Sequence, residues 1–331
     1  MEKGHWTAGR ILQVSSSYWE ACTLHAGIKL DIFSFIGNTG FSADQIAEKL
    51  DCELQGMTVL LNALTAMGLL IKNPEGLYSN SDPAKLLLVR DSMSYIGHIV
   101  MHHHHLVEPW SKLDKAVRSG GPVRVRAERS QVERESFLMG MFNMAMAIAP
   151  EVAGLVKLEG RRQLLDLGGG PGTYAIHFCR TNPGLKATVY DLETTRPFAE
   201  KTISRFGLSE RISFMEGNYL TDEITGRYDV IWMSHILHGE GPEEAAGIVR
   251  KAVSVLKKNG LLLIHDFILN DTLDGPLFPA LFSLNMLVNT DGGRSYSEKQ
   301  IREMMMEYGL DSITRLPFKG PNDSGILSGR L

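Results

Sequence analysis

The chain has 331 residues, of which 44% are hydrophobic and 22% are charged, and its formal net charge at pH 7 is −4. This length is enough for two domains and a sizeable core, and the composition is that of a soluble globular protein. The charge balance excludes binding of nucleic acid through an overall basic surface, and a local basic run at 124–130 is interpreted as a solvated face.

Cysteine usage and the N-terminal sequence indicate a cytoplasmic protein. Cys22, Cys52 and Cys179 are odd in number and have no C-x-x-C spacing, so neither a disulfide framework nor a zinc ribbon is expected. The first ten residues contain no apolar signal core, and no run approaches the length of an apolar membrane span. We therefore expect no membrane partner.

The first hundred residues have the pattern of helices followed by a small β-hairpin. Apolar residues recur at helical spacing over 7–36, and Ser42 with Gln45 predicts a capped helix after them. A helix over 54–67 precedes two short extended segments around the turn "NPEG" at 73–76. This order is typical of a winged helix, whose second helix can enter the major groove of DNA. Here that helix carries no Lys or Arg, so the pattern favours a packing or dimerisation module over DNA binding.

Four consecutive histidines, His102 to His105, lie in the segment "MHHHHLVEPW". On a single helix over 92–105, only His98, His102 and His105 share a face. Imidazoles on one face can bind a transition metal, but no nearby cysteine or acidic cluster completes such a site. We expect adventitious binding of nickel or zinc here rather than a physiological metal.

From about residue 160, short apolar runs alternate with helical stretches. Runs such as "RQLLDL", "KATVYDLE", "YDVIWMS" and "GLLLIHDF" are separated by helical sequence, which predicts a mostly parallel sheet covered on both faces. Two further strands, "DSITRLPF" and "GILSGRL", are joined by "KGPNDS" and close the chain as a hairpin. The expected fold class is therefore α/β, with a Rossmann-like sheet of seven strands.

A glycine-rich loop, "LLDLGGGPGTY" at 164–174, lies where a predicted strand meets a predicted helix. Its glycines permit conformations and close approaches that a Cβ would block, next to a helix N-terminus. A dinucleotide motif from Gly168 would require glycine at position 173, which is Thr173, and Pro171 interrupts the motif. No G-K-[ST] follows, which excludes a P-loop.

Two carboxylates accompany this loop. Asp166 comes just before the glycines, where it can face the ammonium group of an amino acid. Asp191 ends the next predicted strand, 23 residues after Gly168, where a carboxylate can accept both ribose hydroxyls. A nucleoside with an amino-acid tail and no pyrophosphate is S-adenosylmethionine. Asn218 and Tyr219 follow the third strand, where an amide can read adenine and a ring can stack on it; ordinary loop residues are the alternative for both.

Two histidines follow the fourth predicted strand, at the edge where open α/β sheets bind their ligands. They are His235 and His238, and the next strand ends in "IHDF", which brings Asp266 to the same edge. A carboxylate at this place can orient an imidazole and favour its charged form. His238 is therefore the candidate base and Asp266 its partner.

These motifs resemble class I S-adenosylmethionine-dependent methyltransferases, specifically the caffeate and hydroxyindole O-methyltransferase-like family with its bacterial relatives. The resemblance covers nearly the whole chain and is carried by "PWSKLDKAVRSGGP", "LLDLGGGPG", "VYDLE", "ILH" and "GGR". It implies a winged-helix dimerisation domain over 1–105, inter-domain helices lining an acceptor pocket over 106–158, and a cofactor-binding methyltransferase domain over 159–331. It also implies a homodimer formed through the N-terminal domain, and His238 as general base.

The resemblance carries over site residues by position. With Asp166 and Gly170 of the glycine loop, the expected cofactor-binding residues are Gly168, Asp191, Leu192, Asn218, Tyr219 and Ser234. The expected acceptor-binding residues are His105, Trp110, Phe137, Met141, Phe282, Asn285 and Met286. No metal is expected, since the inferred chemistry needs none.

The sequence departs from the family pattern next to the candidate base. Gly239 and Glu240 replace the Asp-Trp that usually follows the catalytic histidine, and Ser295 stands where plant members have a second Glu. The main interpretation is methyl transfer to a hydroxyl of a small aromatic acceptor. Transfer to N, S or C, a cofactor-binding relative that no longer methylates, and a winged-helix regulator are the alternatives.

Overall fold

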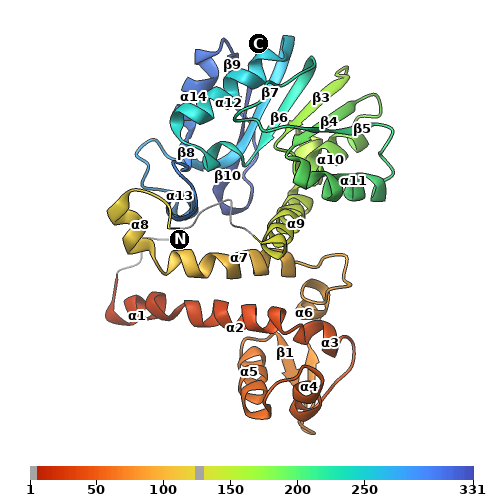
Figure 1. Cartoon of the computed structure of the whole chain (residues 1–331), viewed down its shortest axis with the longest axis vertical. Helices are drawn as coiled ribbons and strands as arrows, with labels where there is room; N and C mark the ends of the chain where they lie inside the picture. The colour runs from red at the N-terminus through yellow and green to blue at the C-terminus, as the bar shows by residue number, and fades with distance from the viewer. Residues whose placement is uncertain (1–5, 124–129) are drawn as a thin grey trace. The chain divides into compact units, whose positions relative to one another are not determined.

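The computed structural model describes residues 6–123 and 130–331 (Figure 1). The chain forms two compact units: an N-terminal unit up to Leu106 that also includes Gln131–Asn143, and a C-terminal unit of Val107–Ser130 and Met144–Leu331. The predicted inter-domain segment 106–158 is divided between them, and the predicted domain boundaries remain predictions. The basic run at 124–130 lies, except for its last residue, outside the described residues.

The N-terminal unit starts with three helices where the sequence predicted continuous helical periodicity. They are α1 (Ala8–Ser16), α2 (Tyr18–Lys29) and α3 (Ile32–Ile36). Asp31 separates α2 from α3 because it adopts a left-handed conformation, with φ of 57°, which ends a helix and which Asp tolerates better than most residues.

The rest of this unit follows the predicted helix–helix–hairpin order. The helix α4 (Ala43–Lys49) begins with the predicted capping box of Ser42 and Gln45, in which each side chain accepts a backbone N–H of the other residue. Next come α5 (Leu54–Ala66), the antiparallel pair β1 (Leu70–Lys72) and β2 (Tyr78–Asn80), and α6 (Asp82–Leu87). Their apolar faces enclose a core that includes Ile32, Phe33, Ile46, Leu61 and Leu64.

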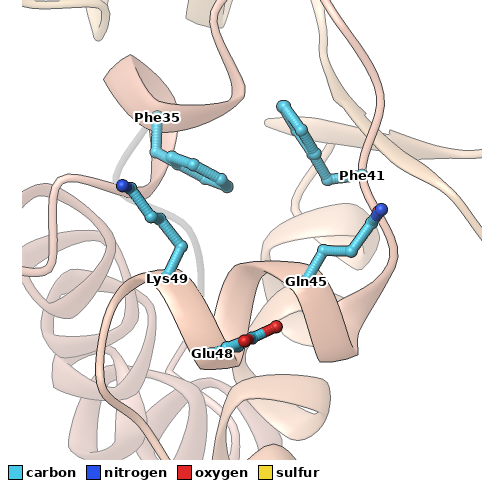
Figure 2. Close-up of a pocket in the computed structure, with 5 residues that line it drawn as sticks. All are labelled: Phe35, Phe41, Gln45, Glu48 and Lys49. Carbon is cyan, nitrogen blue, oxygen red and sulfur yellow. The ribbon is translucent and has the colours of Figure 1, made fainter.

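A depression of about 480 Å³ lies between α3 and α4 (Figure 2). Phe35 and Phe41, with ring centroids 4.7 Å apart, form its apolar side, and Gln45, Glu48 and Lys49 of α4 form its polar side. None of the residues predicted to bind cofactor or acceptor lines it.

The histidine-rich segment lies on α7 (Gly97–Trp110), which starts five residues later than the 92–105 helix considered from the sequence. The imidazoles point to different neighbours: the ring of His102 lies 5.2 Å from that of Phe137, and the ring of His104 lies 5.5 Å from that of His25. In the part of the chain that the structure describes, no three metal-ligand atoms converge at this helix. His102 and His104 therefore act as packing side chains of the N-terminal unit, while His103 is exposed.

We expect the N-terminal unit to lose stability as the pH falls below about 6.5. Burial lowers the pKa of His25 to about 4, and the neighbouring His104, His103 and His105 add to this effect. The folded chain thus holds His25 neutral in a range where the unfolded chain protonates it. The resulting stability is full above pH 6.5 and falls by up to about 1.4 kcal/mol per pH unit towards pH 4.

Denaturant unfolding at fixed protein concentration, from pH 8 to pH 4, measures this effect. A His25→Phe variant should show a shallower slope between pH 6.5 and 4 than the wild type. Equal slopes would show that His25 does not carry the pH dependence.

The C-terminal unit contains the predicted sheet. Its strands are β3 (Gln163–Leu167), β4 (Lys186–Asp191), β5 (Ile212–Glu216), β6 (Tyr228–Ser234), β7 (Leu256–Leu269), β9 (Asp311–Arg315) and β10 (Ser324–Arg330). The order is β5-β4-β3-β6-β7-β10-β9, parallel up to β7 and antiparallel in the final hairpin, so the predicted fold class is confirmed. A short strand that the sequence did not predict, β8 (Tyr296–Ser297), pairs with the end of β7.

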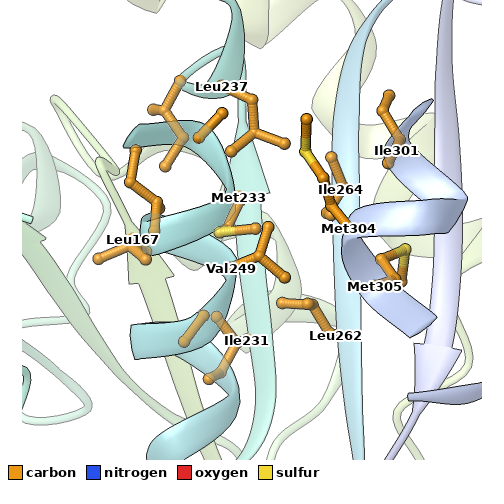
Figure 3. Packing of buried hydrophobic residues seen from close by; sticks show 14 of the residues in the cluster. Leu167, Ile231, Met233, Leu237, Val249, Leu262, Ile264, Ile301, Met304 and Met305 are labelled. Atoms are coloured by element: carbon orange, nitrogen blue, oxygen red, sulfur yellow. The ribbon is translucent and has the colours of Figure 1, made fainter. Parts of the chain in front are cut away.

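Helices cover both faces of this sheet. On one face α12 (Pro242–Ser254) and α14 (Glu298–Glu307) pack on β3, β6 and β7, and Figure 3 shows this cluster with Val249 and Met305 opposite Met233 and Ile264. The other face carries α10 (Thr173–Thr181), α11 (Arg196–Arg205) and the C-terminal part of α9 (Gln131–Leu155). The unit also contains α8 (Leu113–Ser119), α13 (Leu277–Asn289) and the short 3-10 helices Glu193–Thr195, Leu237–Gly239 and Pro321–Asp323.

One described helix, α9, is long and apolar enough to cross a membrane by length and composition alone. Its best window has a mean hydropathy of 1.4. Its residues Ala149, Val152 and Ala153 are buried in the core of the C-terminal unit, and core helices of globular proteins pass the same test. The length criterion therefore does not by itself make α9 a membrane segment.

Candidate functional site

The predicted cofactor residues lie at the carboxyl ends of four strands that are neighbours in the sheet. In spatial order, Asn218 follows β5, Asp191 ends β4, Gly168 follows β3 and Ser234 ends β6. The order of the strands along the chain reverses between β3 and β6, and open α/β sheets bind ligands at such a point. The topology thus brings residues from four distant parts of the sequence to one edge.

The glycine loop has a backbone that requires glycine at two predicted positions. Gly168 has φ of 67°, and a Cβ there would lie 2.5 Å from Cγ2 of Ile236. Gly170 has φ of 53° and open space where a Cβ would lie, and its N–H donates to Oδ2 of Asp191 over 2.8 Å. The loop is therefore held against the end of β4 and the turn that follows β6, and it leaves room beside Gly170 for a ligand.

Both acidic residues of this edge are buried and hydrogen-bonded. Asp191 accepts the N–H of Gly170 and Leu192 and the hydroxyl of Thr195, while burial raises its pKa. Asp166 is 1% exposed and accepts the N–H of Ala175 in the first turn of α10. Burial raises the pKa of Asp166 to about 7, so its charged form lacks a compensating cation in the protein alone.

The other predicted cofactor residues lie at or just after the ends of β4, β5 and β6. Oγ of Ser234 lies 2.9 Å from Nδ1 of the buried His265. Asn218 has its side-chain oxygen turned to the N–H of Leu220. Leu192, directly after β4, is 50% exposed, and Tyr219, in the loop after β5, is half-buried.

The candidate base and its partner form a close pair. Nδ1 of His238 lies 2.6 Å from Oδ1 of Asp266, as the spacing of the two strand ends suggested. Asp266 also accepts the backbone N–H of Phe267 over 2.8 Å. Burial raises the pKa of Asp266, but His238 and His235 outweigh burial and hold this pKa below its ordinary value. Asp266 is therefore ionised and orients the imidazole of His238 by accepting the Nδ1 proton.

Several residues near this pair had not been assigned roles from the sequence. Nδ1 of His235 lies 3.5 Å from the same Asp266 oxygen. The ring of Phe267 stacks on His238 at 5.9 Å, and Phe278 lies 4.9 Å from Phe267. The H-x-x-H spacing of His235 and His238 was visible in the sequence, whereas nothing in the local pattern around Phe267 and Phe278 distinguished them from core residues.

The predicted acceptor residues fall into both units. Phe282, Asn285 and Met286 lie on α13 of the C-terminal unit, where the ring of Phe282 is 4.8 Å from that of His238. Trp110, in the same unit, donates its indole N–H to Oδ1 of Asn285 over 2.8 Å. His105 of α7 and the residues Phe137 and Met141 of α9 belong to the N-terminal unit.

The structure also shows the surroundings of Ser295 and Glu240, two of the residues that depart from the family pattern. Ser295, where a second Glu was considered, is 2% exposed and donates its backbone N–H to Ser283. Glu240 is largely buried, and its backbone oxygen accepts the hydroxyl of Tyr296. Asp266 is therefore the carboxylate hydrogen-bonded to His238 in the described part of the chain.

The sheet is parallel and ends in an antiparallel hairpin; a glycine loop follows its first strand, and an acidic residue ends its second strand. These features define a class I S-adenosylmethionine-dependent methyltransferase. The O-methyltransferase domain profile matches residues 110–311, and the O-methyltransferase dimerisation domain profile matches residues 12–90. The chain belongs to this O-methyltransferase family.

Relatives cover nearly the whole chain. A 3-hydroxy-5-methyl-1-naphthoate 3-O-methyltransferase of Streptomyces sahachiroi is 28% identical over 96% of this chain and 94% of its own. An L-tyrosine C(3)-methyltransferase of Streptomyces lavendulae is 28% identical over 92% and 87%. The solved structure of PigF with SAH matches with a TM-score of 0.90 and 25% identity over 98% and 100%; PigF of Serratia is an S-adenosyl-L-methionine-dependent methyl transferase. The chain is accordingly a methyltransferase that uses S-adenosylmethionine.

Proposed function

We propose that this enzyme transfers a methyl group to a hydroxyl oxygen of a small aromatic acceptor, with His238 as general base. The observation that carries the proposal is the 2.6 Å contact between His238 and Asp266, at the sheet edge where the glycine loop lies. Because Asp266 accepts the Nδ1 proton, Nε2 of His238 is left without a proton and can accept one from an acceptor hydroxyl.

The cofactor fits the residues of the glycine loop. At Gly170 there is space for a ligand to approach the backbone closely. The buried Asp166 carboxylate would be stabilised by a cation such as the ammonium group of an amino acid. We assign the ribose to Asp191, the adenine side to Leu192, Asn218 and Tyr219, and the region between cofactor and acceptor to Ser234. When bound, S-adenosylmethionine supplies an electrophilic methyl group on a sulfonium. The enzyme's contribution is alignment and desolvation, which can lower the barrier by about 7–11 kcal/mol.

An aromatic acceptor is supported by the surroundings of His238. Its ring is flanked by Phe267 and Phe282, and Phe278 stacks on Phe282 at 5.8 Å. Such rings offer flat apolar surfaces for an aromatic acceptor. The naphthoate O-methyltransferase among the relatives acts on an aromatic acid. Within the C-terminal unit, Trp110, Asn285 and Met286 would contact the acceptor; the assignment of His105, Phe137 and Met141 stays a prediction from the sequence.

Transfer to carbon or nitrogen is the second candidate. It is favoured by the L-tyrosine C(3)-methyltransferase among the relatives and by the departures from the family pattern next to His238, Gly239 and Glu240 in place of Asp-Trp. A methyl-transfer screen over phenols, hydroxyindoles, quinols and tetrapyrroles, read by release of S-adenosylhomocysteine, tests both. NMR of the product distinguishes a new O-methyl group from C- or N-methylation. An enzyme that binds the cofactor but methylates none of them would contradict the proposal.

We propose that the N-terminal unit is a winged-helix dimerisation module that binds no DNA, and that the enzyme is a cytoplasmic homodimer. Helix α5 carries neither Lys nor Arg, which leaves it unsuited to phosphate binding. Helix α1 buries no residue within the chain, and its neighbourhood exposes a series of large apolar side chains: Trp6, Ile11, Leu12, Val14, Tyr18 and Trp19. Such a surface in a dimerisation domain is suited to a second copy of the chain. Cys22, Cys52 and Cys179 are free, in keeping with a reducing compartment.

We expect a Leu12→Glu, Trp19→Glu double variant to be largely monomeric, because it places two charges where apolar side chains 68% and 64% exposed would meet the partner. Light scattering at micromolar concentration measures the mass. Met306→Glu on α14, outside the dimerisation domain, is the matched control, since Met306 is 57% exposed. A monomeric wild type would contradict the proposal.

A further inference from the structure

Three metal-ligand atoms converge beside the glycine-loop edge of the sheet. One ring nitrogen of His235, one of His238 and a carboxylate oxygen of Asp266 all lie within 4.8 Å of one another. Among residues 6–123 and 130–331, no other set of three His, Cys, Asp or Glu side chains does so. Two imidazoles and one carboxylate are a donor set that zinc and neighbouring divalent transition metals accept.

The local backbone explains why both imidazoles face the same carboxylate. His235 adopts φ of 57°, a left-handed conformation that is uncommon for a residue with a side chain. Its N–H donates to the carbonyl of His265 on β7, which fixes the start of the turn against the strand that carries Asp266. The 3-10 turn Leu237–Gly239 then brings His238 back to the same strand. A strained conformation that persists at a site is a reason to look for function there.

The contact that holds His235 is a long one. Its Nδ1 atom is buried and lies 3.5 Å from Oδ1 of Asp266, without a well-formed hydrogen bond. A buried nitrogen without a hydrogen bond costs free energy, so a ligand atom bridging it to the neighbouring donors would remove that cost.

We propose that His235, His238 and Asp266 bind a divalent transition metal of the zinc type, with an open fourth position. Ligand atoms around tetrahedral zinc lie about 3.4 Å apart, given metal–ligand distances of about 2.1 Å. The observed separations from Oδ1 of Asp266, 2.6 Å to His238 and 3.5 Å to His235, lie on either side of this value. Small rotations of these side chains would therefore complete the site.

The surroundings support a bound metal in two ways. The backbone N–H of Phe267 donates to the Asp266 carboxylate and keeps it in place, as hydrogen bonds to metal ligands commonly do. The ring of Phe267 also lies 4.4 Å from that of His235, and the ring of Phe282 lies 4.8 Å from that of His238. These rings limit access of water to the ligand atoms.

Metal binding would inhibit methyl transfer, a consequence that rests on the proposed function. As a base, His238 carries its proton on Nδ1, donated to Asp266, and leaves Nε2 free. As a metal ligand through Nδ1, it carries its proton on Nε2, and that nitrogen then has no lone pair to accept the acceptor's proton. The two roles of His238 exclude each other.

Titration of Co²⁺ into EDTA-treated full-length protein tests the binding itself. We expect about one equivalent to give the intense visible bands of low-coordinate Co²⁺, and Zn²⁺ to displace it. The bands should weaken, with affinity at least about 10-fold lower, in His235→Gln. They should persist in His103→Gln, which removes an exposed imidazole of the histidine-rich helix α7.

Calorimetry with S-adenosylmethionine shows that each variant is folded, and Asp266→Asn serves as a second variant if His235→Gln is not. Absence of the bands in the wild type, or bands lost in His103→Gln but kept in His235→Gln, would overturn the proposal. Once an acceptor is known, Zn²⁺ should inhibit turnover and EDTA should restore it. Failure to find any methyl acceptor would leave the Co²⁺ result unaffected, so the two proposals fail separately.

Discussion

Replacing His238 with alanine should lower turnover by at least about 100-fold and leave the affinity for S-adenosylmethionine nearly unchanged. The variant loses the nitrogen that accepts the acceptor's proton, while the glycine loop and Asp191 do not depend on this side chain. Steady-state kinetics with the acceptor found by the screen gives the turnover, and calorimetry gives the cofactor affinity.

Two further variants make this result specific. Asp266→Asn should reduce turnover less than His238→Ala, because the base itself remains, although an amide neither fixes its tautomer nor stabilises a charged imidazole. His103→Ala, on the exposed part of α7, should leave turnover unchanged. Unchanged turnover of His238→Ala on the true acceptor would show that another group removes the proton, or that none needs to.

A Gly168→Ala variant should lose both stability and cofactor binding. A Cβ at this position would lie 2.5 Å from Cγ2 of Ile236, a branched side chain that is itself largely buried. The residue would also have to keep φ of 67°, which costs about 1–2 kcal/mol for a residue other than glycine. We expect a lower denaturant midpoint and at least about 10-fold weaker binding of S-adenosylmethionine.

Gly170→Ala is the matched comparison. It has the same left-handed backbone, with φ of 53°, but no atom lies within 4 Å of its Cβ. Its loss of stability should therefore be limited to the backbone cost, while the added methyl group fills space that we assign to the cofactor. If both variants bind S-adenosylmethionine as the wild type does, the glycine loop is not the cofactor site.

The local sequence pattern predicted much of the fold, because these elements depend on residues that are close together in the sequence. The strand–helix alternation after residue 160 gave the sheet, and Ser42 with Gln45 gave the start of α4. The start of α7 was misplaced because of a hydrogen bond outside the helical pattern: the N–H of Ile96 donates to the carbonyl of Leu87, nine residues earlier, and not to residue 92. The helix propensity of residues 92–96 does not predict that hydrogen bond.

The site was predictable to the extent that topology determines it. Strand ends in a parallel sheet meet at one edge, so Asp191 and the pair His238–Asp266 followed from the order of the elements. His235 lies near the same carboxylate because its backbone is left-handed, and the sequence "SHILHG" did not predict that conformation. The position of Phe278 beside Phe267 likewise depends on how α13 packs, not on its own periodicity.

The buried carboxylate beneath the glycine loop makes cofactor binding a proton-coupled event. With a pKa of about 7, Asp166 in the folded chain retains near neutrality a proton that the unfolded chain has already lost above pH 4. This group therefore makes the cofactor-free fold less stable as the pH rises from 4 to 7. An arriving ammonium group would stabilise the carboxylate and expel the proton. The binding enthalpy of S-adenosylmethionine at pH 7 would then vary with the ionisation enthalpy of the buffer, and its affinity would increase as the pH rises through 7.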